Sequence, residues 1–354
     1  MLKPRKLSTP RLAIGIFICA VLITGGAHKN VRAQQSGPQV APQTRERAFK
    51  LYEQGDIKGA LSLLRAAVKE HKEDANAWYF LGLALNRDGD AKGARKAFET
   101  AVKLRPDFVE ARTAWAYMLL LANKNQDAER EAETALNSGG AQNAEAQYVL
   151  AVVSSRAGEL KKSLEKAEAA LAVKPDFSPA LLLRSEVLIS LFMQETTPAN
   201  AEPVALRYAH LKEAAISLEK YLALNPKVKD AAFWREQLET LRAYKDAYDD
   251  KGKPDSERTI FPPNQVTTKA RILRRVEPTY TEAARQAGVR GTVVIRAILA
   301  ADGIVKRILV VRSLSMGLTE RAVEAARKIK FVPATKDGRP VSQYVQIEYN
   351  FNLY

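Results

Sequence analysis

A 34-residue repeat between residues 44 and 249 constrains the fold of this chain more than any other feature. One repeat places large and small apolar residues at regular positions, namely Trp78, Leu81, Gly82, Leu85, Ala94, Phe98, Ala101 and Pro106. The repeat before it has Ala48, Leu51, Gly55, Ala60, Leu64 and Ala67, and the next has Trp115, Ala116, Leu119, Ala128, Ala132 and Ala135. Units of this length bury their apolar faces only against their neighbours. The sequence therefore predicts a solenoid of stacked helix pairs.

The spacing of these residues resembles the tetratricopeptide repeat. A fourth set, from Leu150 to Pro175, is displaced by one residue. A fifth repeat is predicted to be split, with one helix at 181–193 and another ending near Pro226, and with an insertion loop at 194–210 between them. A long amphipathic helix over 229–248 is predicted to cap the open end of the array.

Repeat arrays of this kind bind peptides in a groove lined by the first helix of each pair. The corresponding positions here are Asn76, Tyr79, Asn86, Arg87, Tyr117, Tyr148 and Arg156. Aromatic rings and guanidinium groups together suit an extended or acidic peptide. The alternative is a solvated helical face whose tyrosines pack against neighbouring helices.

The last ~75 residues follow a different pattern, since β-branched runs replace helical spacing. Two such runs, 293–299 and 304–311, flank Asp302-Gly303, which predicts a hairpin. Short helices are predicted at 282–287 and 318–329. Apolar and polar residues then alternate without a break over 341–353, the pattern of a strand with one buried face. The order predicts a small α+β domain with two helices on one face of an antiparallel sheet.

This segment resembles the TonB C-terminal domain, and the resemblance rests on many positions in order. They include Pro278-x-Tyr280, Ala283-Ala284, Gly288-x-x-Gly291-Thr292-Val293, Asp302-Gly303, Ala325-Ala326, Phe331-x-Pro333-Ala334 and Asp337-Gly338-x-Pro340-Val341. The resemblance implies that an outer-membrane receptor or another envelope protein adds a strand to the edge of the terminal strand. The residues expected at that edge are Ser342, Tyr344, Gln346, Glu348 and Asn350. The alternative is an ordinary structural strand.

The N-terminus has the layout of an export signal. Basic residues precede an apolar run over 12–23, and Val31-Arg32-Ala33 offers a cleavage site before Gln34. Residues 1–33 are therefore a predicted signal peptide, with an uncleaved signal anchor as the alternative. Residues 34–43 are predicted to be a disordered linker, 44–249 the solenoid, 250–270 a polar linker broken by prolines, and 271–354 the TonB-like domain.

Composition argues against catalysis. Cys19, the only cysteine, lies in the signal, and the three histidines have no partners at ligand spacing. No phosphate loop or nucleophile motif is present, so we expect no enzyme, no cofactor and no metal. Residues 1–33 hold six of the 55 Lys and Arg and none of the 40 acids, which leaves +9 of the net charge of +15. Most of that excess follows Arg271. It suits acidic partners, anionic envelope polymers or lipid headgroups, whereas an exported chain without a nucleic-acid motif is not expected to bind nucleic acid.

Two functions remain open on the sequence alone. In the first, an energy transducer couples an inner-membrane proton-driven motor to a TonB-dependent outer-membrane receptor. In the second, a soluble periplasmic adaptor holds one protein in the solenoid and another on the terminal domain. The apolar run lacks the Ser and His at helical spacing that the TonB family uses to contact its motor, which favours the adaptor.

Overall fold

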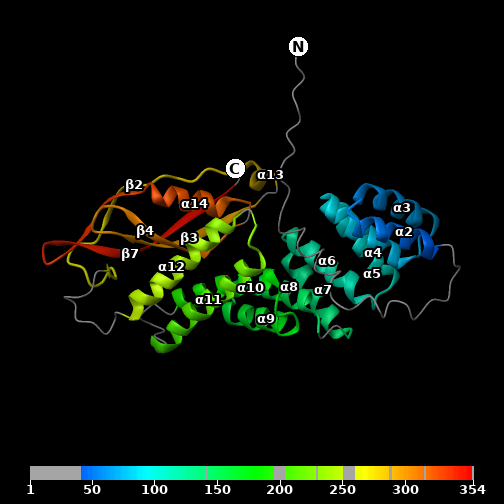
Figure 1. The fold of residues 1–354 in the computed structure, drawn as a ribbon, viewed down its shortest axis with the longest axis horizontal. Coiled ribbons are helices and arrows are strands. Elements are labelled where there is room, and N and C mark those ends of the chain that lie inside the picture. The colour runs from blue at the N-terminus through cyan, green and yellow to red at the C-terminus, as the bar shows by residue number, and fades with distance from the viewer. Residues whose placement is uncertain are drawn as a thin grey trace, which may run out of the picture. The chain divides into compact units, whose positions relative to one another are not determined.

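The computed structural model describes residues 41–139, 142–194, 204–228, 230–249, 260–286, 289–314 and 316–352. The predicted signal peptide and residues 34–40, 195–203 and 250–259 of the predicted linkers and insertion lie outside the described residues. Two compact units make up the chain, Met1–Ala157 and Gly158–Tyr354. Figure 1 shows their helices and strands, coloured along the chain.

The first unit consists of helix pairs, which confirms the predicted solenoid. Its helices are α2 (Ala41–Glu53), α3 (Ile57–Glu70), α4 (Ala75–Asp88), α5 (Ala91–Leu104), α6 (Val109–Leu121), α7 (Asn125–Asn137) and α8 (Ala144–Ala157). Asp56, Asp74 and Asp90 cap α3, α4 and α5, each accepting a backbone N–H three residues on. Gly89 ends α4 in the left-handed conformation. Caps at the repeat period thus fix where each helix begins and ends.

Helices α4 and α5 approach each other closely where Gly82 faces the Phe98 ring. Phe98 is fully buried and also contacts the Tyr79 ring, with centroids 5.9 Å apart. A Cβ atom at Gly82 would lie 2.5 Å from the Phe98 ring. Only glycine therefore leaves room for the aromatic side chain that fills the gap between these helices.

Replacing Gly82 by Ala should destabilise the first unit by about 1–3 kcal/mol, because the Phe98 ring has to move within a packed core. The sign of this change in the free energy of unfolding tests the crowding at Gly82, since Gly→Ala inside an uncrowded helix stabilises by about 0.5–1 kcal/mol. Urea denaturation measures the change. In the double variant Gly82→Ala with Phe98→Leu, the loss should be smaller than the sum of the losses in the two single variants, and additive losses would contradict the contact.

The second unit begins with four helices, α9 (Leu160–Val173), α10 (Ser178–Gln194), α11 (Val204–Leu224) and α12 (Ala231–Asp249). Helix α11 starts at Val204, so the predicted insertion loop is wrong over 204–210. Pro203 in the sequence directly precedes this helix, where proline is well tolerated, and no Gly or Pro interrupts the chain before Leu224. The α12 helix agrees with the predicted cap within two residues.

The sheet follows in the same unit, with strands β1 (Ile260–Phe261), β3 (Gly291–Leu299), β4 (Val305–Arg312), β6 (Ala334–Lys336) and β7 (Arg339–Phe351). Its order is β1-β7-β3-β4, with β6 also paired to β7. A separate ribbon joins β2 (Arg271–Arg274) to β5 (Lys330–Val332). Asp337 and Gly338 both have positive φ, as the tight β6–β7 turn requires. The predicted hairpin and terminal strand are confirmed.

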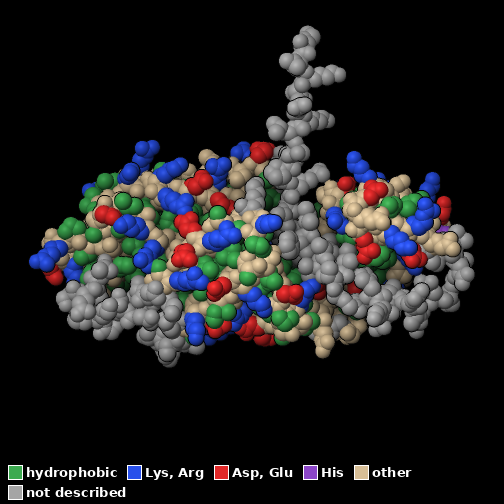
Figure 2. All heavy atoms as spheres, viewed as in Figure 1, with side chains coloured by type: hydrophobic (Ala, Val, Ile, Leu, Met, Phe, Trp, Pro, Cys, Tyr) green, Lys and Arg blue, Asp and Glu red, His purple; other side chains and the backbone are tan. Residues whose placement is uncertain are grey.

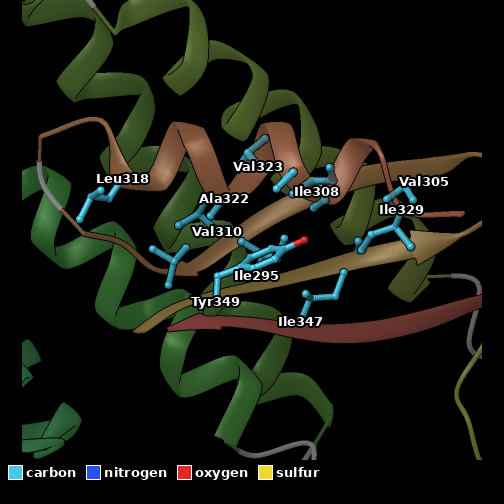
Figure 3. Close-up of a cluster of buried hydrophobic side chains, with 14 of the residues drawn as sticks. Ile295, Val305, Ile308, Val310, Leu318, Ala322, Val323, Ile329, Ile347 and Tyr349 are labelled. Atoms are coloured by element: carbon cyan, nitrogen blue, oxygen red, sulfur yellow. The ribbon is translucent and has the colours of Figure 1, made fainter. Parts of the chain in front are cut away.

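Helix α14 (Leu318–Arg327), with α13 (Glu282–Gln286) nearby, covers one face of this sheet. Figure 3 shows side chains of α14 pointing onto those of β3, β4 and β7, including Ala322, Ile295 and Tyr349. Tyr349 and Phe351 are almost fully buried there. This is the predicted two-layer arrangement, in which alternate residues of each strand supply the core.

The opposite sheet face is also covered, by α10 and α12, and α11 packs against both of these helices. Phe192, Leu241 and Tyr244 of these helices share one core with Val294 and Leu309 of the sheet. The sequence predicts a linker over 250–270 between two domains, and its described part is instead structured. Ile260 pairs with Ser342, Thr268 bridges Thr335, and the Ala270 N–H donates to the Gln343 side chain. The last solenoid helices and the sheet thus form one packed body.

Candidate functional site

The outer edge of β7, meaning the edge that faces away from β3, is the candidate binding site. On its inner side, β7 pairs with β3 over nine residues, from Gln343 to Phe351. On its outer side, β1 pairs only at Ser342 and Gln343. Among the described residues, no strand pairs with the outer edge over 344–351. Six to eight residues of backbone are therefore available to an extended peptide, about 20–25 Å of strand.

The alternation of an antiparallel ladder decides which residues direct their backbone groups outward. Arg339 and Lys336 close the tight turn on the inner side, so odd-numbered residues of β7 face β6 and β3. Ser342 pairs with β1 on the outer side. The Glu348 carbonyl accepts a hydrogen bond from the Arg275 side chain. Tyr344, Gln346, Glu348 and Asn350 therefore present N–H and C=O groups at the outer edge.

Arg275 occupies the middle of this edge. Its guanidinium donates to the Glu348 carbonyl, lies 4.5 Å from the centre of the Tyr349 ring and pairs with Glu277 at 3.0 Å. Burial raises the pKa of Tyr349, and the Arg275 cation opposes that rise. A side chain of this kind protects an exposed strand edge without closing it.

The opposite edge of the sheet, on β4, is sealed by helical side chains. Gln237 of α12, which is 2% exposed, donates to the Ile308 carbonyl at 3.1 Å and accepts from the Val310 N–H at 2.8 Å. Ser190 of α10 donates to the Val311 carbonyl at 2.8 Å. Gln237 thus takes the place of a neighbouring strand, and β4 has no such row of backbone groups left for a peptide.

The side chains predicted for the strand edge divide into two groups. Gln346, Glu348 and Asn350 are exposed. Ser342 accepts a hydrogen bond from the Ala301 N–H, and Tyr344 is held inside the unit. The Tyr344 ring lies 5.6 Å from that of Tyr244 and 4.6 Å from the Arg296 guanidinium. The Tyr344 side chain therefore anchors β7 to α12, and the exposed side chains of the edge are those of Gln346, Glu348 and Asn350.

The residues predicted for the solenoid groove also divide. Tyr79 and Tyr117 are buried, and Tyr79 packs among the rings of Phe80, Phe98 and Phe108. These two tyrosines belong to the core, because the repeat pattern does not separate a groove position from the adjoining packed one. The structure leaves Asn76, Asn86 and Tyr148 partly exposed and Arg87 and Arg156 exposed.

Arg87 and Arg156 make the same contact in different repeats. Arg87 donates to the Tyr52 carbonyl and Arg156 to the Leu120 carbonyl, each at 3.0 Å and each one repeat earlier. Although Arg156 as a whole is exposed, its guanidinium lies against the Leu120 carbonyl and Asn125, and this partial burial lowers its pKa, while the adjacent Tyr148 and Tyr117 raise it. The two arginines thus tie successive repeats together, as well as lining one face.

Sequence reasoning missed three residues that shape these surfaces. They are Gln237, Arg275 and Arg105, and the last donates to the Asn76 side chain at 3.1 Å and lies 3.5 Å over the Phe108 ring. Burial lowers the pKa of Arg105, against the opposing effect of Glu110. No local pattern marks any of them, because the backbone or side-chain hydrogen bond that each donates is to a residue distant in sequence.

Comparison with known proteins supports both halves of the fold. Residues 276–353 match the family model of the Gram-negative bacterial TonB protein C-terminal, and residues 48–108 match that of the tetratricopeptide repeat. The chain thus contains a tetratricopeptide repeat region followed by a TonB C-terminal domain. Both families are interaction domains, and neither is a catalytic family.

Among curated proteins, the chain is similar to Protein TonB of Vibrio cholerae serotype O1, with 35% identity over 92 residues. The match spans 26% of this chain and 38% of that relative, well under half its length. Among solved structures, it is similar to PilW, described as a widely conserved type IV pilus biogenesis factor, with 17% identity, 63% of this chain and 97% of that one covered and a TM-score of 0.46. MamA from Desulfovibrio magneticus RS-1 has 21% identity, covers 55% of this chain and 99% of its own, and has a TM-score of 0.41.

Proposed function

We propose that this protein is a binding scaffold of the cell envelope that receives an extended segment of a partner along the outer edge of β7. The single observation that carries the proposal is that, within the described part of the chain, no strand pairs with the outer edge of β7 over 345–351, while β3 pairs with its other side. Strand addition supplies main-chain hydrogen bonds with little demand on partner sequence. The similarity to TonB supports an outer-membrane receptor as that partner.

The state of the β4 edge indicates which side of the sheet accepts the partner strand. A two-edged sheet could extend at either side, but on β4 Gln237 and Ser190 already bind the Ile308 and Val311 carbonyls and the Val310 N–H. A partner strand therefore adds beside β7, where it displaces Arg275 from the Glu348 carbonyl. The displaced guanidinium then remains beside the new strand and can pair with an acidic side chain on it.

The solenoid is proposed to hold a second protein segment. Asn76, Asn86, Arg87, Tyr148 and Arg156 combine amide, phenol and guanidinium groups, which suit an extended peptide with acidic residues. The protein would then connect two partners through one chain. This supports a periplasmic adaptor.

Coupling to an inner-membrane motor would require an anchor in that membrane. Among the described residues, no helix has the length and hydropathy needed to cross a bilayer. N-terminal sequencing of the mature protein distinguishes the two functions. Retention of residues 1–33 supports the energy transducer, and a terminus at Gln34 supports the adaptor.

Replacing Gln346 by Pro should weaken partner capture about tenfold, because proline removes one outward N–H and its ring obstructs the adjoining bond. Each such bond contributes about 0.5–1.5 kcal/mol. The inner ladder to β3 stays intact, since residue 346 does not donate to it. The measurement is photo-crosslinking of the full chain to envelope proteins from probes at Glu348 and Asn350, followed by titration of the crosslinked partner.

Two further variants control this experiment. Gln346→Ala keeps the N–H and should bind as the parent does, while Ile304→Pro places proline in an exposed turn of the same unit. Thermal unfolding verifies that each variant is folded. If Gln346→Pro and Gln346→Ala bound equally well while folded, strand addition at β7 would be excluded.

A further inference from the structure

The β2–β5 ribbon carries an exposed patch that mixes cations with large apolar side chains. All four residues of β2 are exposed, and Leu273 is exposed by 57% and Val332 of β5 by 43%. Soluble proteins rarely leave such side chains together on a surface without a partner. We name Arg271, Leu273, Arg274, Lys330 and Val332 the ribbon patch.

The pairing of the ribbon shows that these residues share its outward side. Ile272 pairs with Phe331, and Phe331 is buried in the core under α14, which identifies the inward side. Arg271 pairs with Val332, and Arg274 pairs with Lys330. Cross-strand partners lie on the same face, so both pairs face outward. Leu273 lies at the irregularity between them.

The cations of the ribbon patch have no acidic partner among the described residues. Within the residues that the structure describes, Arg271, Arg274 and Lys330 form no ion pair, whereas Arg327 pairs with Glu236 and Arg321 with Glu324. Figure 2 shows Lys and Arg side chains, with hydrophobic atoms among them, along the margin of the unit where Figure 1 places β2 and α14. The patch thus offers positive charge and apolar area at one site.

We propose that the ribbon patch docks on the surface of an anionic phospholipid bilayer. Charge complementarity selects an anionic partner, because three unpaired cations lie within one two-stranded ribbon. The apolar side chains select a bilayer over a soluble polyanion, because Leu273 and Val332 can enter the boundary between headgroups and acyl chains, which a polyanion lacks. The inference is independent of strand addition, since β2 and β5 do not form the β7 edge.

The test is flotation of the full chain with vesicles of phosphatidylcholine, with and without phosphatidylglycerol. The combined variant Arg271→Gln, Arg274→Gln, Lys330→Gln should lose about 100-fold in affinity for the anionic vesicles. A charge-matched control, Lys58→Gln, Lys92→Gln, Lys96→Gln, changes three exposed solenoid cations and should lose far less. Residues 1–33 are the same in every variant, so differences between variants do not come from that segment.

A second pair of variants tests the apolar part. Leu273→Ser should weaken anionic vesicle binding several-fold and make the remainder more sensitive to salt. Ile304→Ser, at a turn residue also exposed by 57%, should leave it unchanged. Equal losses in the two charge variants would overturn the proposal. A second outcome would also overturn it. If Leu273→Ser bound anionic vesicles as the parent does, and the ribbon charge variant lost as much affinity for dextran sulfate as for vesicles, the ligand would be a soluble polyanion.

Discussion

Replacing Phe98 by Ala is expected to lower the free energy of unfolding of the first unit by about 3–5 kcal/mol, because the ring is fully buried and Gly82 cannot fill the cavity. Repeats stabilise one another only through neighbours, so the loss at α4 and α5 should spread along the helix pairs. Urea denaturation followed by far-UV circular dichroism measures it as a lower midpoint.

Trp78 provides the matched comparison, since it is another large aromatic residue of the same repeat. Its side chain is only partly buried, and its indole N–H donates to the Lys72 carbonyl. Trp78→Ala should therefore cost about 1–2 kcal/mol, less than half the effect of Phe98→Ala. Equal losses for the two variants would contradict the assignment of Phe98 as the central core residue.

Replacing Gln237 by Leu is expected to destabilise the packing of α12 on the sheet by about 2–5 kcal/mol. The Ile308 carbonyl and the Val310 N–H would both lose their partner while buried, and each orphaned group costs about 1–3 kcal/mol. Amide hydrogen exchange should accelerate at Val310 of β4 before it does in β3 and β7.

Glu239→Leu is the control for this variant, because Glu239 lies two residues further along α12 with an exposed side chain. It should leave exchange at Val310 unchanged. If Gln237→Leu also left it unchanged, the sheet and the last solenoid helices would be independent domains, as the sequence predicts.

The sequence predicts the elements of this fold well, because their signals are local. The 34-residue period fixes the helix pairs through small residues such as Gly82, and alternation identifies β7 down to its buried Tyr349 and Phe351. Asp337-Gly338 predicts its turn through the positive φ that both residues adopt. These features depend on residues close in sequence, so no knowledge of the tertiary structure is needed.

The contacts between distant elements could not be predicted in this way. Gln237 looks like one more polar residue of an amphipathic helix, and its two backbone partners lie about 70 residues away. The polar, Pro-containing stretch before Ala270 resembles a linker, although its backbone pairs with β7. In the solenoid groove, Tyr79 and Tyr148 occupy equivalent repeat positions, yet only the packing around Phe98 and Phe108 buries the first.

The strand order β1-β7-β3-β4 also has a mechanical consequence. A tether attached along β7 and pulled parallel to the strand loads the nine β3–β7 residue pairs in shear, so they resist together and do not open one after another. The load passes from β3 to β4 and then, through Gln237 and Ser190, into α12 and α10. A sheet whose edge strand β4 is hydrogen-bonded to helices α12 and α10 is suited to bear tension along the chain.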